Sequence, residues 1–205
     1  MKDNFYFFFF LSLFIWSCNS SNEPLPILSK KIIENGEIAY EKIPSFSFVN
    51  QDSNTITNQN FEHKIYVADF FFTHCPTICP IMTQQMLRIH EHFLDNDYLH
   101  ILSHTIDPKR DTVLHLKHYA KNIGAFAPKW HFVTGDKDEL YDIADHYYNK
   151  VVEDQNLPDG FDHSGRFILV DEEGLIRAYC NGTSEEEVSE FIEKIEQLIQ
   201  ENAKK

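Results

Sequence analysis

The chain has 205 residues, of which 42% are hydrophobic and 24% are charged, as is typical of a globular protein with one core. Its 32 acidic and 18 basic residues give a formal net charge of -14, and no cluster of Lys or Arg interrupts the sequence. Nucleic acids and anionic lipid surfaces are negatively charged, so this composition excludes them as favoured partners.

The N-terminal residues, MKDNFYFFFFLSLFIWSCNSSNEP, predict an export signal. One lysine precedes the apolar run 5–16, which is too short to span a bilayer comfortably but has the length of a signal-peptide core. A small residue before Cys18, with Ile15 three positions upstream, resembles the lipobox of bacterial lipoproteins. We expect residues 1–18 to be a signal peptide whose lipobox makes Cys18 the lipidated residue. An ordinary signal peptide and an uncleaved anchor are the alternatives.

All three interpretations of the N-terminus predict an exported protein of the cell envelope. The lipoprotein and the uncleaved anchor would hold it on the membrane, facing the periplasm or the cell exterior. Residues 19–40 are expected to be a polar tether, and residues 41–205 a single folded domain.

The folded part begins with extended segments. Residues 43–61 alternate apolar and polar side chains around a turn-rich centre, which predicts a hairpin at the N-terminal edge of the domain. Residues 64–72, KIYVADFFF, are a continuous β-branched and aromatic run, as expected of a central buried strand. The three phenylalanines that end this run are therefore expected in the core.

Helices and strands then alternate along the rest of the chain. The pattern predicts helices at 80–94, 112–123, 136–149 and 188–199, strands at 98–106 and 130–135, and a hairpin at 166–180. Pro80 suits a first helical turn, and Gly124 ends a helix that Asp111 or Thr112 would cap. The loop 151–165 lacks periodicity, and long loops of this kind are often functional. The order of elements predicts an α/β fold, with a central mixed sheet covered by helices on both faces.

Two cysteines, Cys75 and Cys79, lie where the buried strand gives way to a helix, in DFFFTHCPTICPIMTQQM. Active cysteines of the thioredoxin fold occupy this position, so we expect a thioredoxin-like fold. Backbone N–H groups and the positive end of the helix dipole favour a thiolate there. If Cys18 carries lipid, Cys180 is left as the odd cysteine, which argues against a framework of structural disulfides. Cys180 is expected to be buried and inert.

The spacing of Cys75 and Cys79 leaves both disulfide closure and shared metal coordination open, because i and i+4 side chains of a helix share a face. Thiol-disulfide oxidoreductases of this fold usually carry two intervening residues, whereas this chain has three. The wider spacing leaves more room for a metal, and two thiolates favour soft ions such as Cu(I).

A histidine would complete a three-coordinate site. His163 is the candidate, because the strand after it lies beside the cysteine-bearing strand in a thioredoxin-like sheet. His74 adjoins Cys75, but neighbouring side chains of an extended segment point apart. Four other histidines are expected at solvated helix positions: His90, His92, His115 and His118.

Three motifs occur in order, CPTICP, IDPKRDT and DHSGRFILVD, and together they resemble the SCO/SenC family of thioredoxin-fold copper proteins from about Ile43 onward. The resemblance implies a copper site, for Cu(I) or Cu(II), formed by Cys75, Cys79 and His163. It implies delivery of copper to the CuA centre of cytochrome c oxidase subunit II, or reduction of that subunit's cysteines. An upstream copper donor or a thiol reductant is the other partner, and the N-terminal anchor supplies the membrane contact.

Residues around these motifs have simpler interpretations as well. Asp107, Arg110 and Asp111 would support the copper loop electrostatically or dock a partner, but we favour a turn with an aspartate N-cap. Asp162 would orient His163 through a hydrogen bond, or simply lie in the loop.

The sequence therefore favours a metallochaperone without turnover of its own over an enzyme. A thiol-disulfide reductase, which needs Cys75 and Cys79 but not His163, is the alternative. A peroxidase of the peroxiredoxin type would carry Thr or Ser three residues before its active cysteine, where this chain has Phe72. A structural disulfide between cysteines so close in sequence would remove little unfolded-state entropy.

Overall fold

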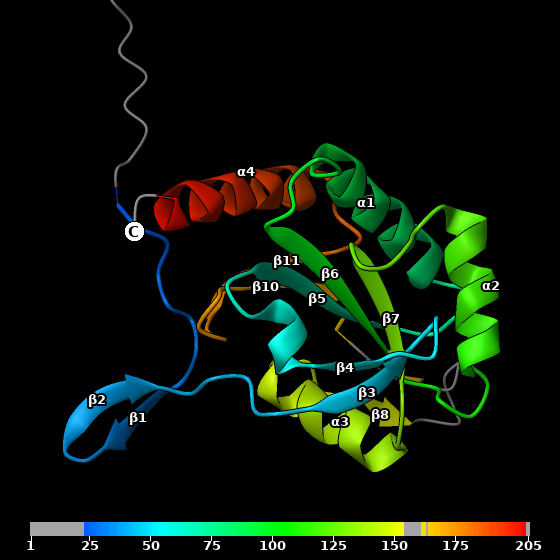
Figure 1. Ribbon diagram of the computed structural model, residues 1–205, viewed down its shortest axis with the longest axis horizontal. Helices are drawn as coiled ribbons and strands as arrows, with labels where there is room; N and C mark the ends of the chain where they lie inside the picture. Colours follow the sequence, from blue (N-terminus) through cyan, green and yellow to red (C-terminus); the bar gives the residue numbers. More distant parts are fainter. Residues whose placement is uncertain (1–22, 154–160, 163, 204–205) are drawn as a thin grey trace, which may run out of the picture.

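The computed structural model describes residues 23–153, 161–162 and 164–203. Its centre is a seven-stranded sheet in the order β11-β10-β5-β6-β7-β3-β4 (Figure 1). The three central strands β5, β6 and β7 are mutually parallel, and the flanking strands are antiparallel to their neighbours. This mixed sheet confirms the predicted α/β class. The strands are β3 (Ser47–Asn50), β4 (Thr55–Thr57), β5 (Ile65–Phe71), β6 (Leu99–Thr105), β7 (Trp130–Thr134), β10 (Arg166–Val170) and β11 (Ile176–Asn181).

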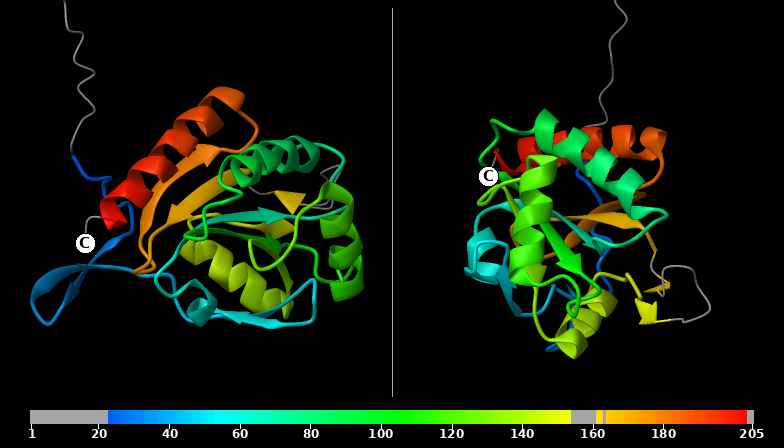
Figure 2. Two further views of the ribbon diagram at one scale, coloured as in Figure 1. Left: turned by 45° about the horizontal axis from the view of Figure 1, so that its top comes forward. Right: turned by 90° about the vertical axis from the view of Figure 1, so that its right-hand side faces the viewer.

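Helices cover both faces of this sheet (Figures 1 and 2). Right-handed crossovers from β5 to β6 and from β6 to β7 place α1 and α2 on the same face. The Thr83 hydroxyl lies 2.7 Å from the Tyr119 hydroxyl and joins these two helices, and Arg88 donates to Ser189 of α4. The helix α3 lies on the opposite face. The helices are α1 (Cys79–His92), α2 (Val113–Ile123), α3 (Lys137–His146) and α4 (Glu185–Asn202).

The helix ends follow their capping residues. Thr112 is the N-cap of α2, and its hydroxyl accepts from the N–H of His115 at 3.3 Å. Gly124 ends the same helix with φ = 77°, a left-handed conformation that glycine adopts without steric cost, as the sequence predicted. The helix α1 begins directly at Cys79, with Pro80 in its first turn. The second cysteine is thus part of a helix N-terminus.

The core sits on the central strands. Every residue of β5 and β6 is buried, which confirms the predicted central strand. Phe70, Phe71 and Phe72 are at most 3% exposed, so they are core residues as expected. Burying one such side chain contributes about 1.5–3 kcal/mol to the stability of the fold. These strands therefore give the loops at their ends a fixed starting position.

The N-terminal segment contains structure that the sequence did not predict. The hairpin of β1 (Lys31–Glu34) and β2 (Glu37–Tyr40) projects from the body of the molecule (Figure 1). Upstream of it, Leu28 donates its N–H to Ile176 at 2.8 Å and so runs beside the sheet edge. Residues 1–22, including Cys18, lie outside the described residues. The division into leader, tether and domain therefore stays a prediction.

The loop between α3 and β10 is also more regular than expected. A short antiparallel pair, β8 (Val152–Glu153) and β9 (Phe161–Asp162), brackets residues 154–160, which lie outside the described residues. The predicted adjacency of the next strand to the cysteine-bearing strand is confirmed, because β10 pairs with β5. Among the described residues, no helix is both long enough and apolar enough to cross a bilayer.

Candidate metal centre

The two cysteines lie at the end of β5, where the chain turns into α1. Both are free thiols in the structure, and Cys75 and Cys79 are 6% and 3% exposed. Only Cys79 belongs to the helix. The preceding loop folds back so that Cys75 Sγ accepts the N–H of Cys79 at 3.4 Å and lies 3.4 Å from the Thr77 hydroxyl. The first sulfur therefore faces the positive end of α1.

This arrangement gives the two thiols opposite acidities. Burial acts to raise the pKa of Cys75, but hydrogen bonds from the Thr77 hydroxyl and from the N–H groups of Cys79 and Thr77 outweigh it, so this pKa is lowered. The pKa of Cys79 is raised, first by burial and then by the negative charge of Cys75. Cys75 is therefore the more acidic thiol of the pair, and Cys79 the less acidic one.

A buried carboxyl group, Asp69, lies on β5 beneath this site. Burial raises its pKa from 3.8 to about 7, and the hydrogen bond from the Ser103 hydroxyl offsets only part of this effect. When ionised, the charge of Asp69 contributes to keeping Cys79 protonated. No sequence pattern pointed to Asp69, because one aspartate in an apolar run does not reveal which side chains will surround it.

Asp111 holds the cysteine loop in place from the neighbouring β6–α2 loop. Its carboxylate accepts the N–H of Thr73 at 3.1 Å, the Thr73 hydroxyl, and the Thr105 hydroxyl at 2.6 Å. The N-cap interpretation of Asp111 is therefore wrong, because its side chain is committed to Thr73 and Thr105 while Thr112 caps α2. Arg110 forms an ion pair with Asp107 within the same turn.

His163 and the side chain of Asp162 lie outside what the structure describes. The residues flanking position 163 do contact the cysteine loop. The Phe161 ring lies 4.9 Å from that of Phe72, which precedes the loop. On the other side, Gly165 lies close to Ile78, the residue directly before Cys79. A Cβ added at Gly165 would be 3.2 Å from Ile78 Cδ1. Phe161 and Gly165, each two positions from 163, therefore lie close to the two ends of the loop. Ser164, the residue next to 163, instead donates to Asn149 Oδ1.

The structure also tests the burial expected for the other histidines and for Cys180. His90 is buried, 7% exposed and packed 5.5 Å from the Trp130 ring, so its expected solvated position is wrong. Cys180 is buried as expected, and burial raises its pKa to about 12. His115, expected at a solvated helix position, is half-buried, and its ring stacks on that of His74 with the centroids 5.1 Å apart. This contact joins the cysteine loop to the first turn of α2 and has no signature in the local sequence.

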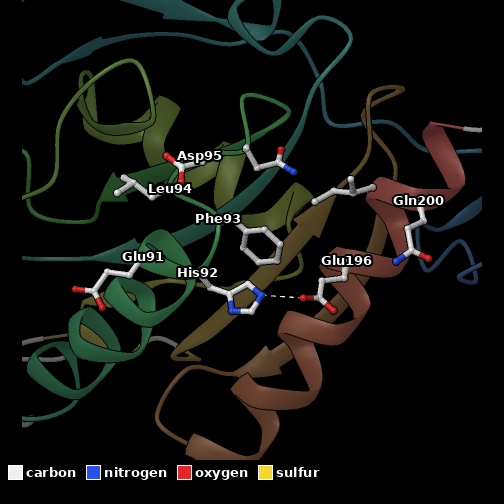
Figure 3. Close-up of a pocket in the computed structure, with 9 residues that line it drawn as sticks. Glu91, His92, Phe93, Leu94, Asp95, Glu196 and Gln200 are labelled. Carbon is white, nitrogen blue, oxygen red and sulfur yellow. Dashed lines mark hydrogen bonds and ion pairs between the residues drawn. The ribbon is translucent and has the colours of Figure 1, made fainter.

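A groove lies between the C-terminal end of α1 and α4 (Figure 3). His92 Nε2 and Glu196 Oε1 approach to 2.8 Å across it. The cysteines are at the opposite end of α1, and a helix of 14 residues is about 20 Å long. The groove is therefore separate from the cysteine centre.

The fold and the site define a thioredoxin-like protein with a two-cysteine centre at the end of its central strand. Residues 36–200 match the sequence profile of the SCO1/SenC family. The SCO1 protein homolog of Bacillus subtilis is 30% identical over 158 residues, covering 76% of this chain and 81% of that protein. The chain belongs to the SCO1/SenC family.

Solved structures agree with this assignment. One of BsSco, described as a member of the Sco family of cytochrome c oxidase assembly proteins, matches with a TM-score of 0.70 and 25% identity, covering 86% of this chain and 98% of that one. Yeast Sco1 with copper bound matches with a TM-score of 0.63 and 26% identity, covering 78% of this chain and 89% of that one.

The unequal acidities predict unequal reactivity. With the full chain reduced, iodoacetamide at neutral pH should label Cys75 before Cys79 and Cys180, because the thiolate is the nucleophile. Mass spectrometry of peptides sampled over time and pH gives the three rates. Thr77→Val should shift the Cys75 profile to higher pH, whereas Thr55→Val, at an exposed position of β4, should leave it unchanged. Equal labelling of the three cysteines would contradict the assignment.

The pKa of Asp69 predicts a pH-dependent stability. Between pH 4 and 7 the unfolded chain loses the Asp69 proton while the folded chain keeps it, so this group lowers the free energy of unfolding as the pH rises. Asp69→Asn removes this effect. Its unfolding free energy relative to wild type should therefore increase between pH 4 and pH 8, by up to about 4 kcal/mol. Urea denaturation at both pH values measures the difference, and a constant difference would refute the raised pKa.

Proposed function

We propose that this protein is a copper metallochaperone of the cell envelope that delivers copper to the CuA centre of cytochrome c oxidase subunit II. The observation that carries the proposal is the pair of buried cysteines with opposite acidities at the N-terminus of α1. Membership of the SCO1/SenC family supports it, as does the presence of copper in the yeast relative and the assembly role given for BsSco.

Cys75, Cys79 and His163 are the proposed copper ligands. The lowered pKa of Cys75 favours its deprotonation, so Cys75 would bind a Cu(I) ion first. Cys79 would then release its proton, since a metal competes with protons for thiol sulfur. The contacts of Phe161 and Gly165 with the cysteine loop support His163 as the third ligand.

Delivery follows from the low coordination number of such a site. Two thiolates favour Cu(I), and a three-coordinate ion leaves room for an incoming cysteine of the recipient. The ion then passes by ligand exchange, with no net change in its charge and no turnover by the chaperone. An upstream donor would load the site by the same exchange.

The proposed location is the outer side of a membrane. The apolar run 5–16 followed by Cys18 supports export and lipid attachment, with the following residues reaching to the domain. Such an anchor would keep the copper site near a membrane-bound oxidase, where the encounter between the two proteins is confined to the membrane surface.

A thiol-disulfide reductase is the second candidate, and the low pKa of Cys75 favours it. The Cys75 thiolate would attack a disulfide of the oxidase subunit, forming a mixed disulfide and releasing one partner thiolate. Cys79, after losing its proton, would attack Cys75 Sγ, close the Cys75–Cys79 disulfide and release the second partner thiol. Two electrons pass to the partner, and His163 takes no part.

Anaerobic Cu(I) titration of the reduced full chain against a competing chelator separates the two functions. Wild type should bind one ion, and Cys75→Ala, Cys79→Ala and His163→Ala should each weaken binding at least about 10-fold, or 1.4 kcal/mol. Cys180→Ala and His118→Ala are the matched controls and should bind as wild type does. Binding indifferent to His163, together with a readily reducible cysteine pair, would favour the reductase.

A further inference from the structure

Three potential ligands, one from the cysteine loop and two from the end of the β6–α2 loop and the start of α2, meet at one place. His74 follows the end of β5, Asp111 lies in the β6–α2 loop, and His115 lies in the first turn of α2. One ligand atom from each lies within 4.8 Å of the others. The Thr73 hydroxyl hydrogen-bonds both His74 Nδ1, at 3.0 Å, and the Asp111 carboxylate, and so ties the two ligands together.

The electrostatics of Asp111 favour a cation here. Its side chain is fully buried, and among the described residues its one ion-pair contact is with His74, at 4.0 Å from Asp111 Oδ1 to His74 Nδ1. Carboxylates buried in proteins are paired with a positive group or coordinate a metal. Three hydrogen bonds occupy three of the roughly four lone-pair sites of this carboxylate, which leaves one acceptor site on Oδ1, the oxygen nearer His74.

The geometry is close to that of a bound ion. Imidazole nitrogens and carboxylate oxygens bind metals at about 2.0–2.2 Å, so ligand atoms on one ion lie at most about 4 Å apart. The three ligand atoms lie within 4.8 Å of one another, so they would have to approach by less than about 1 Å to bind one ion. The side chain of His74 is 47% exposed, so solvent rather than core surrounds about half of it and leaves room for a small rotation. Three protein ligands at a solvent-exposed position also leave a coordination site open for exchange.

We propose that His74, Asp111 and His115 form a second metal site, which takes a divalent transition-metal ion and holds Cu(II) most tightly. Two imidazoles and one carboxylate are nitrogen and oxygen donors, which suit divalent ions, and affinities for such ligands peak at Cu(II) in the first-row series. The cysteine centre, with its thiolates, favours Cu(I). The protein then carries two sites of different oxidation-state preference, joined through the adjacent residues His74 and Cys75.

The test uses the full chain with every proposed ligand of the cysteine centre removed, as Cys75→Ser, Cys79→Ser and His163→Ala together. This background contains no cysteine of the pair to reduce Cu(II), so the result is independent of whether the cysteine centre binds copper. Into it are introduced His74→Ala, His115→Ala or His118→Ala. The last is an exposed histidine of the same helix, outside the cluster. Circular dichroism checks that each variant is folded.

Each variant is titrated with Cu(II) and examined by electron paramagnetic resonance. The background should bind one Cu(II) with hyperfine coupling to two imidazole nitrogens. His74→Ala and His115→Ala should each remove one nitrogen coupling and weaken binding at least about 10-fold, whereas His118→Ala should change neither. No binding in the folded background would overturn the proposal, as would equal binding in all variants, which would mean adventitious binding to surface histidines.

Discussion

The hydrogen bonds to Cys75 Sγ are the interaction on which the proposed chemistry of this protein depends. They come from the Thr77 hydroxyl and from backbone groups at the start of α1, and they lower the pKa of Cys75, whereas burial raises the pKa of Cys79. The unequal pair presents one nucleophilic sulfur, which serves ligand exchange with a metal and exchange with a disulfide equally well.

The rest of the fold holds this loop against the helix. The fully buried strand β5 fixes where the loop starts, and α1 fixes where it ends. Asp111 secures Thr73 from one side, and Phe161 and Gly165 contact the loop from the other. Contacts from segments distant in sequence therefore hold the loop in place, so its conformation depends on the tertiary structure around it.

Much of this architecture could be predicted from sequence, because its signals are local. The apolar run of β5 and the end of α2 at Gly124 each depend on a few adjacent residues. The position of the cysteines at a strand-to-helix junction follows from the same patterns. The motif order and spacing then supplied the family, which the comparisons confirm.

The features that sequence could not predict are contacts between segments. His90 is buried because Trp130 of β7 packs on it, although its helical spacing alone suggested solvent. The cluster of His74, Asp111 and His115 forms only when the cysteine loop meets the start of α2 and the loop before it. Thr77 lowers the pKa of Cys75 through one hydrogen bond between its hydroxyl and Cys75 Sγ. None of these contacts has a local pattern, so only the tertiary structure reveals them.

The central claim is that one copper ion is held by both cysteine sulfurs and one imidazole. X-ray absorption at the copper edge, on the full chain loaded anaerobically with one equivalent of Cu(I), tests it most directly. The account predicts two sulfur scatterers and one imidazole nitrogen in the first shell, with the imidazole lost in His163→Ala. A first shell of nitrogen and oxygen alone, or one that His163→Ala leaves unchanged, would contradict it.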